Sequence, residues 1–159
     1  MKSVKMYVLA CLSAVFLLAG CGSDPVKEDL THYFENDLPK MAAQEKEIAD
    51  QFTQISANKQ LDPQSVIETL DQQVIGKYAA FLAELEKIQP ETPEVQQVHA
   101  QYLEASRLNQ EALEMIVQSL KEKNQEQYVA ARAKLDEASE KVKQSKTAIK
   151  ELADQYGVQ

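Results

Sequence analysis

The chain has 159 residues, and its 25 acidic and 17 basic side chains give a formal net charge of −8 at pH 7. This length suits a single domain. An acidic surface should repel nucleic acid and anionic lipid headgroups, and we therefore expect no nucleic-acid partner. Trp is absent, only four residues are Gly, and Ala, Glu, Gln, Lys and Leu dominate, which is the composition expected of long helices.

The first 20 residues have the pattern of a secretory signal. Lys2 and Lys5 supply positive charge near the start, and no acidic residue occurs in this stretch. An apolar run follows over residues 6–19, interrupted only by Ser13. The run is shorter than the roughly 20 apolar residues that a spanning helix needs. Positive charge followed by a short apolar run therefore predicts an export signal.

The apolar run ends in Leu18-Ala19-Gly20-Cys21. This sequence resembles the lipobox of bacterial lipoproteins, in which Leu, two small residues and an invariant Cys close the signal. The resemblance implies cleavage between Gly20 and Cys21, with a diacylglyceryl and acyl anchor on the Cys21 thiol and no other cofactor. It also implies that the protein is held on the extracytoplasmic face of the cell membrane. This attachment is stable because two acyl chains anchor the protein. An uncleaved anchor helix or an ordinary secretory signal is the alternative.

These features divide the chain into three parts. Residues 1–20 are the cleaved signal, 21–25 are the lipidated cysteine and a short linker, and 26–159 are a helical domain. The linker is so short that the domain should sit close to the membrane. The other cysteine, Cys11, lies within the signal, so the mature chain has no disulfide and depends on its core for stability.

Two helices are predicted in the first half of the domain. The first covers about 26–56 and should be kinked or broken near Pro39, because proline removes a backbone donor and its ring crowds the preceding turn. The second covers about 63–89 and begins at Asp62-Pro63, with Asp62 as the N-cap. Gly76 within this helix either permits close packing or is simply tolerated.

Two further helices are predicted in the second half. One begins at Thr92-Pro93, which repeats the capping device of the second helix. The other begins after Asn124, where Gln127 completes the pattern of a capping box, and stops at Gly157. Both carry apolar residues at spacings that alternate between three and four, which is a heptad seam.

Small residues recur in both seams. When the third and fourth helices are folded as an antiparallel hairpin, a single register places these small residues opposite one another and pairs the larger residues between them. We expect the two axes to approach toward about 8 Å, the lower end of the usual range. The small residues are Ala105, Ala112 and Ser119 in the third helix and Ala131, Ala138 and Ser145 in the fourth.

The predicted fold is all-α, an antiparallel four-helix bundle of long helices with short connections. An even number of helices brings both ends of the domain to the membrane-proximal side. The alternative is an extended helical hairpin or coiled coil that buries its seams by forming oligomers, so the oligomeric state stays open.

No catalytic or metal-binding pattern stands out in the mature chain. We expect His32 to be solvated on an acidic helix and His99 to lie at the edge of the bundle, and we expect no metal site. Asn109 falls on a seam, where it either fixes the helix register or turns toward solvent or Ser106. Five tyrosines are expected mostly at the boundary of the bundle, with a binding surface as the alternative; they are Tyr33, Tyr78, Tyr102, Tyr128 and Tyr156.

These features favour a membrane-anchored interaction module of the cell envelope, with an envelope protein or a cell-wall component as its partner. In overall style the chain resembles small helical lipoproteins of Gram-positive bacteria. The first alternative is a bundle that binds a small or apolar ligand, which needs a cavity. The small-residue seams argue against a cavity between the third and fourth helices, and leave one open between the first two, near Pro39 and Gly76. The second alternative is an enzyme with a scattered carboxylate or histidine site, which is the least supported.

Overall fold

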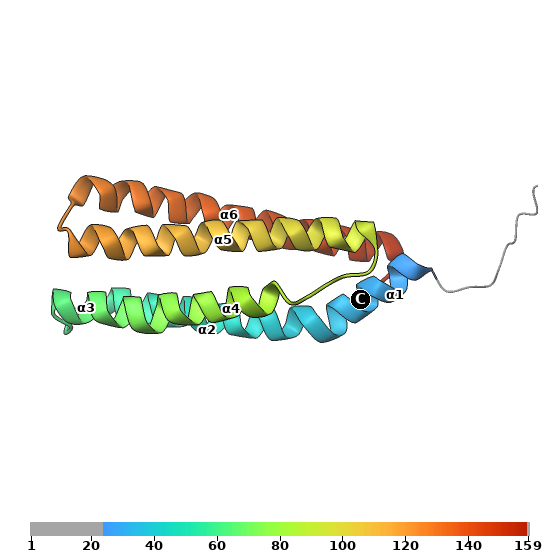
Figure 1. Ribbon diagram of the computed structural model, residues 1–159, viewed down its shortest axis with the longest axis horizontal. Helices are drawn as coiled ribbons and strands as arrows, with labels where there is room; N and C mark the ends of the chain where they lie inside the picture. Colours follow the sequence, from blue (N-terminus) through green and yellow to red (C-terminus); the bar gives the residue numbers. More distant parts are fainter. Residues whose placement is uncertain (1–23, 159) are drawn as a thin grey trace, which may run out of the picture.

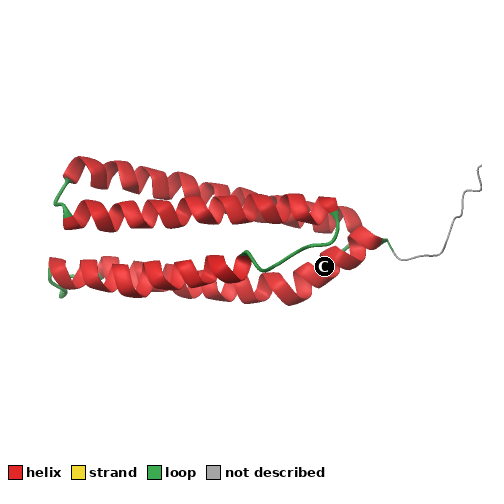
Figure 2. Ribbon diagram, in the orientation of Figure 1, coloured by secondary structure: helices red, strands yellow, loops and turns green. Residues whose placement is uncertain are grey.

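The computed structural model describes residues 24–158, and all regular elements in that range are helices (Figures 1 and 2). The predicted all-α class is confirmed. Gly20, Cys21 and the rest of the predicted signal lie outside the described residues. In chain order the elements are α1 (Pro25–His32), the π-helical η1 (Tyr33–Asp37), α2 (Leu38–Ala57), α3 (Pro63–Thr69), the π-helical η2 (Leu70–Ile75), α4 (Gly76–Leu85), α5 (Pro93–Lys121) and α6 (Gln125–Tyr156).

The first helical arm stays continuous from α1 through η1 to α2. Pro39 has no N–H, and in a regular α-helix its ring would collide with the carbonyl of Glu35 four residues earlier. The wider π turn before it relieves this crowding: the N–H of Leu38 donates to the carbonyl of Tyr33, five residues back. The interruption predicted near Pro39 is therefore a bend without a break, and α1 is inclined to α2 (Figure 1).

The second arm comprises α3, η2 and α4. Asp62 caps it as predicted, because its carboxylate accepts hydrogen bonds from two backbone N–H groups of the first turn. The predicted end at residue 89 is wrong, since α4 ends at Leu85. Gln89 precedes Pro90, and a residue before proline avoids the helical conformation. Gly76 is simply tolerated: a Cβ added there would meet no atom within 4 Å, so the glycine serves no close packing.

The caps of α6 match the sequence prediction in part: Asn124 is the N-cap, but its own N–H donates to the carbonyl of Ser119, so Gln127 does not complete a capping box. Asn124 Oδ1 accepts a hydrogen bond of 3.0 Å from the N–H of Gln127. At the other end, Gly157 has a left-handed φ of 64°, which glycine adopts without steric cost. The N–H of Val158 then reaches back to the carbonyl of Ala153 at 2.9 Å, which is the long hydrogen bond of a Schellman motif.

The helices pack in the sequence α2, α4, α5, α6. The most extensive interface joins α5 to α6, while α4 and η2 pack against α5, and α2 packs against α4 and η2. α1 crosses to contact both α5 and α6, so the C-terminal end of α6 lies beside it (Figure 1). No Cα atom of α2 lies within 8 Å of one in α6. The described helices bury a continuous core among themselves, and one edge of the assembly is left open.

All six small residues singled out in the sequence are buried. The most exposed of them, Ala105 and Ser145, are 4% exposed. The hydroxyls of Ser119 and Ser145 donate to carbonyls three residues earlier in their own helices, which satisfies both groups inside the interface. Small side chains at these positions leave little volume between α5 and α6. Within residues 24–158, no helix has the length and apolar character needed to cross a membrane.

We expect Ala112→Leu and Ala138→Leu each to lower the free energy of unfolding by roughly 1–3 kcal/mol, because the added atoms overpack a closed interface. Urea unfolding followed by circular dichroism measures the change. Ala133→Leu, on the exposed face of α6, is the matched control and should be nearly neutral. Neutral values for both interface variants would show that the predicted register is wrong.

Candidate functional site

A groove runs between α2 and α6, along the edge where the two backbones stay apart and only long side chains meet. Its volume is about 810 Å³, within the range typical of ligand sites. Side chains of η2, α4 and α5 reach its floor, and we call it the α2–α6 groove. Its apolar lining consists of Ile48 and Phe52 from α2, Val74 from η2, Leu113 from α5, and Leu135 and Val142 from α6.

Basic residues outnumber acidic ones in the groove lining, but each lysine there is paired with a carboxylate. The pairs are Lys46–Asp50, Lys143–Glu140, Lys146–Glu45 and Lys150–Asp154. Five basic side chains line the groove, against two acidic ones, although the whole chain carries a formal charge of −8. Four of the five come from α6, and three of these follow one another at helical spacing. The basic side chains are Lys46, Arg132, Lys143, Lys146 and Lys150, and the acidic ones are Glu45 and Asp136.

At one end of the groove, Glu45 of α2 contacts side chains of both α5 and α6. Its carboxylate forms an ion pair with Lys146 and accepts a hydrogen bond of 3.2 Å from the hydroxyl of Tyr102. The Lys146 ammonium also lies 5.7 Å from the centroid of the Tyr102 ring, within reach of a cation–π contact. At the other end, the guanidinium of Arg132 lies 6.0 Å from the centroid of the Phe52 ring.

A group of buried polar atoms lies at the floor of the groove. Tyr78 is 3% exposed, and its hydroxyl has no hydrogen-bond partner of good geometry among the described residues, nor have Ser106 Oγ and Asn109 Oδ1. The three side chains are nonetheless neighbours. Burial and the charge of Glu45 raise the pKa of Tyr78, and the nearby Asn109 and Ser106 side chains lower it. All three atoms are closed off from solvent, so they are interior groups whose imperfect hydrogen bonding costs free energy.

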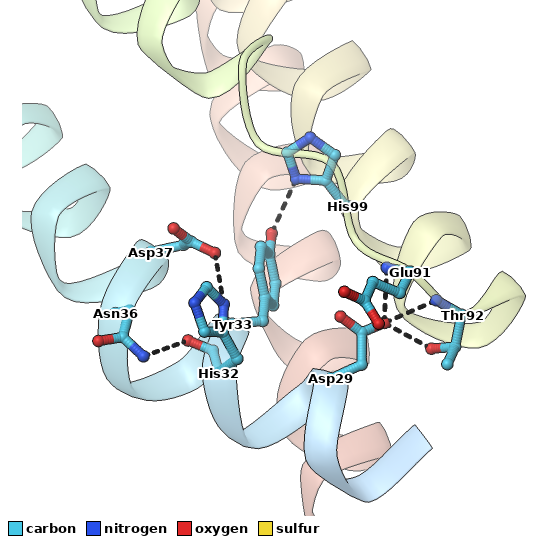
Figure 3. A network of polar contacts seen from close by, with 8 residues as sticks. All are labelled: Asp29, His32, Tyr33, Asn36, Asp37, Glu91, Thr92 and His99. Atoms are coloured by element: carbon cyan, nitrogen blue, oxygen red, sulfur yellow. Dashed lines mark hydrogen bonds and ion pairs between the residues drawn. The ribbon is translucent and has the colours of Figure 1, made fainter. Parts of the chain in front are cut away.

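A second hollow, of about 630 Å³, lies beside α1, and its central carboxylate is already engaged. Asp29 Oδ2 accepts hydrogen bonds from the N–H of Glu91 at 3.0 Å and from the N–H and hydroxyl of Thr92 at 2.7 and 2.6 Å (Figure 3). The predicted side-chain cap by Thr92 is therefore wrong: Thr92 makes no capping hydrogen bond within α5, and its hydroxyl donates to Asp29 instead. A carboxylate at this place also complements the dipole of α5. This network joins α1 to the start of α5.

Both histidines lie near this network (Figure 3). His99 is 6% exposed, which corrects the expected position at the edge of the bundle, and its Nδ1 lies 3.0 Å from the hydroxyl of Tyr33. Burial lowers the pKa of His99, which favours the neutral ring at pH 7. His32 is exposed and lies 3.5 Å from the carboxylate of Asp37. Among residues 24–158, no three metal-ligating side chains come together at a possible ion site.

Only some of the residues singled out in the sequence line the α2–α6 groove. Asn109 lines it, whereas the six small residues lie in the α5–α6 interface. The expectation that the tyrosines lie mainly at the boundary is wrong for three of them: Tyr33, Tyr78 and Tyr102 belong to the core. The sequence also contains a helical spacing that was not used: Lys143, Lys146 and Lys150 recur beside the apolar seam and lie on one face of α6.

We expect Tyr78→Phe to raise the free energy of unfolding by about 1 kcal/mol, because it removes a buried hydroxyl that has no partner. Tyr102→Phe is the control, since it deletes a hydroxyl that is bonded to Glu45 and should lower the free energy by a similar amount. Urea unfolding of both variants gives the comparison. Equal destabilisation would mean that the Tyr78 hydroxyl is satisfied within the fold.

The lining of the groove combines charged side chains, an apolar wall, the buried Tyr78 and the partly buried Asn109. No family model matches the chain, and neither does any curated protein or solved structure.

Proposed function

We propose that this protein is a membrane-anchored binding module of the cell envelope, attached through lipid on Cys21 and displayed on the extracytoplasmic face. The positive start, the short apolar run and the Leu18-Ala19-Gly20-Cys21 sequence support the anchor. The first described helix, α1, begins at Pro25, four residues after the proposed lipid site. That spacing holds the α1 end close to the membrane.

We further infer that the four helical arms form an antiparallel bundle opened along one edge. Short turns connect α2 to α3 and α5 to α6, and each arm packs against the arm that follows it in the chain. Both features support successive arms that run in opposite directions. α1 closes the anchored end through its contacts with α5 and α6. Beyond α1 the bundle is open between α2 and α6, so the groove faces sideways.

The single observation that carries the binding role is the α2–α6 groove. Its apolar wall and basic rim offer a site to a protein segment or a cell-wall component, the partners expected from the sequence. Its volume favours a second candidate, a small ligand with an apolar part. The predicted location of such a cavity was between the first two helices, but the groove lies between the first and the fourth.

Anchoring is tested by changing the proposed lipid site. We expect Cys21→Ala to abolish incorporation of an alkyne-labelled fatty acid and to leave an unprocessed precursor, because the thiol is the atom that is acylated. Cys11→Ala is the matched control and should be labelled and processed normally. Labelling of Cys21→Ala, seen by gel fluorescence, would exclude the lipoprotein assignment.

The binding role is tested in the native envelope with the full chain. A photo-reactive amino acid at Ser139, which lines the groove, should form an adduct that mass spectrometry can detect and identify. The same amino acid at Ala133, exposed on α6 but outside the groove lining, should form none. An absence of adducts at Ser139, or equal adducts at both positions, would contradict a groove-based binding function.

A further inference from the structure

α2 is the least enclosed of the long helices. Its backbone approaches those of α3, η2 and α4 but not those of α5 and α6. Three of its 20 residues are buried, and their spacing of seven forms one narrow stripe; they are Met41, Ile48 and Ile55. α5 has neighbours on both sides and buries eleven of its 29 residues. Less burial holds α2 in place than holds α5, so α2 is the helix that moves at the lower cost in free energy.

The segment before α2 is fixed, and α2 itself is not fixed in the same way. α1 and η1 are held against α5 by the hydrogen bonds of Asp29 and by the contact between Tyr33 and His99. The π turn of η1 lies directly between this fixed segment and α2. At its other end, α2 is followed by non-helical residues until α3 begins at Pro63. Hinges in proteins are often a few residues at the end of an element, which is the position of η1.

Glu45 joins α2 to the opposite side of the groove. Its side chain is only 14% exposed, and its carboxylate pairs with the ammonium of Lys146 in α6. The same carboxylate accepts a hydrogen bond of 3.2 Å from the hydroxyl of Tyr102 in α5. We call these two interactions the Glu45 contact. A partly shielded carboxylate with a cation and a hydroxyl donor forms strong, directional hydrogen bonds, which hold only while α2 stays near α6.

We propose that the edge between α2 and α6 opens and closes, with η1 as the hinge and the Glu45 contact as the interaction that holds the closed form. Opening widens the α2–α6 groove and gives a partner access to floor residues such as Leu113 and Val142. This inference goes beyond the proposed binding function, because it concerns the movement of α2 and requires no ligand.

Glu47 provides an internal comparison. It also belongs to α2, but it pairs with Lys77 of α4, the helix against which α2 packs. Lys77 and Lys146 are similarly exposed, at 43% and 46% of their side chains. The Glu45 contact exists only in the closed form, so its loss shifts the equilibrium toward the open form. The Glu47 pair lies away from the α2–α6 edge, and its loss does not favour either form.

The test measures distances between two spin labels by double electron–electron resonance, in the full chain purified in detergent. The labels are attached to ketone-bearing unnatural amino acids, so that cysteine is not labelled. One pair replaces the exposed Gln44 of α2 and Gln144 of α6, and the reference pair replaces Gln101 of α5 and Gln144. We expect the α2–α6 distances to be more broadly distributed than the α5–α6 distances, with a longer component that represents the open form.

Variants identify the interaction that closes the edge. Glu45→Gln should raise the ratio of long to short α2–α6 distances roughly three- to tenfold, because a neutral amide cannot pair with the Lys146 ammonium. Lys146→Gln removes the same pair from the α6 side and should act in the same direction. Glu47→Gln, the matched control, should change the ratio by less than about twofold. Circular dichroism verifies that each variant is folded.

Three results would overturn the proposal. The first is a single narrow α2–α6 distance that neither Glu45→Gln nor Lys146→Gln changes, which would mean that the edge is rigid. The second is an equal shift in Glu47→Gln, which would remove any special part for the Glu45 contact. The third is a matching change in the α5–α6 distance, which would indicate a general loosening of the bundle. Failure here leaves the binding function untouched, because the photo-crosslinking at Ser139 tests that function separately.

Discussion

Alanine and serine side chains fill the interface between α5 and α6, and their small volume constrains the rest of the packing. The α5–α6 interface is more extensive than any other between the helices. α4 and η2 then pack against α5, and α2 packs against α4, so each arm is added to the one before it. In this arrangement the backbone of α2 approaches that of α4 but not that of α6, which α2 meets only through long side chains. The groove is therefore a consequence of how the arms are added to the α5–α6 pair.

The lysines that line the groove do not make it a strongly positive surface. The lining itself has more basic than acidic residues, although the chain as a whole is acidic. At physiological ionic strength, screening limits the reach of an exposed charge to about 8 Å. Within that distance Lys143 has the carboxylate of Glu140 at 3.5 Å, and Lys150 has that of Asp154 at 2.8 Å. Lys146 is paired with Glu45 in the same way, so nearby carboxylates offset the excess of cations.

Local sequence signals predicted the all-α class and most helix ends, because caps depend on residues that are adjacent in the chain. Asp62, Asn124 and Gly157 all act as expected. Thr92 does not, because its partner Asp29 lies 63 residues away. The groove between α2 and α6 was not predicted, for a related reason: periodicity identifies the apolar side of a helix but not how many neighbours cover it. Phe52 belongs to such an apolar side, yet it remains only partly buried as a wall of the groove.

The two ends of the molecule handle their buried polar groups differently. Near α1, Asp29 takes three hydrogen bonds and the hydroxyl of Tyr33 meets His99, so the network is satisfied and joins α1 to α5. Beneath the groove, the buried oxygen atoms of Tyr78 and Asn109 have no partner of good geometry and no access to solvent. An unsatisfied buried group costs about 1–3 kcal/mol, so this part of the core lowers the stability of the fold. The satisfied network, by contrast, suits a fixed junction beside the proposed anchor.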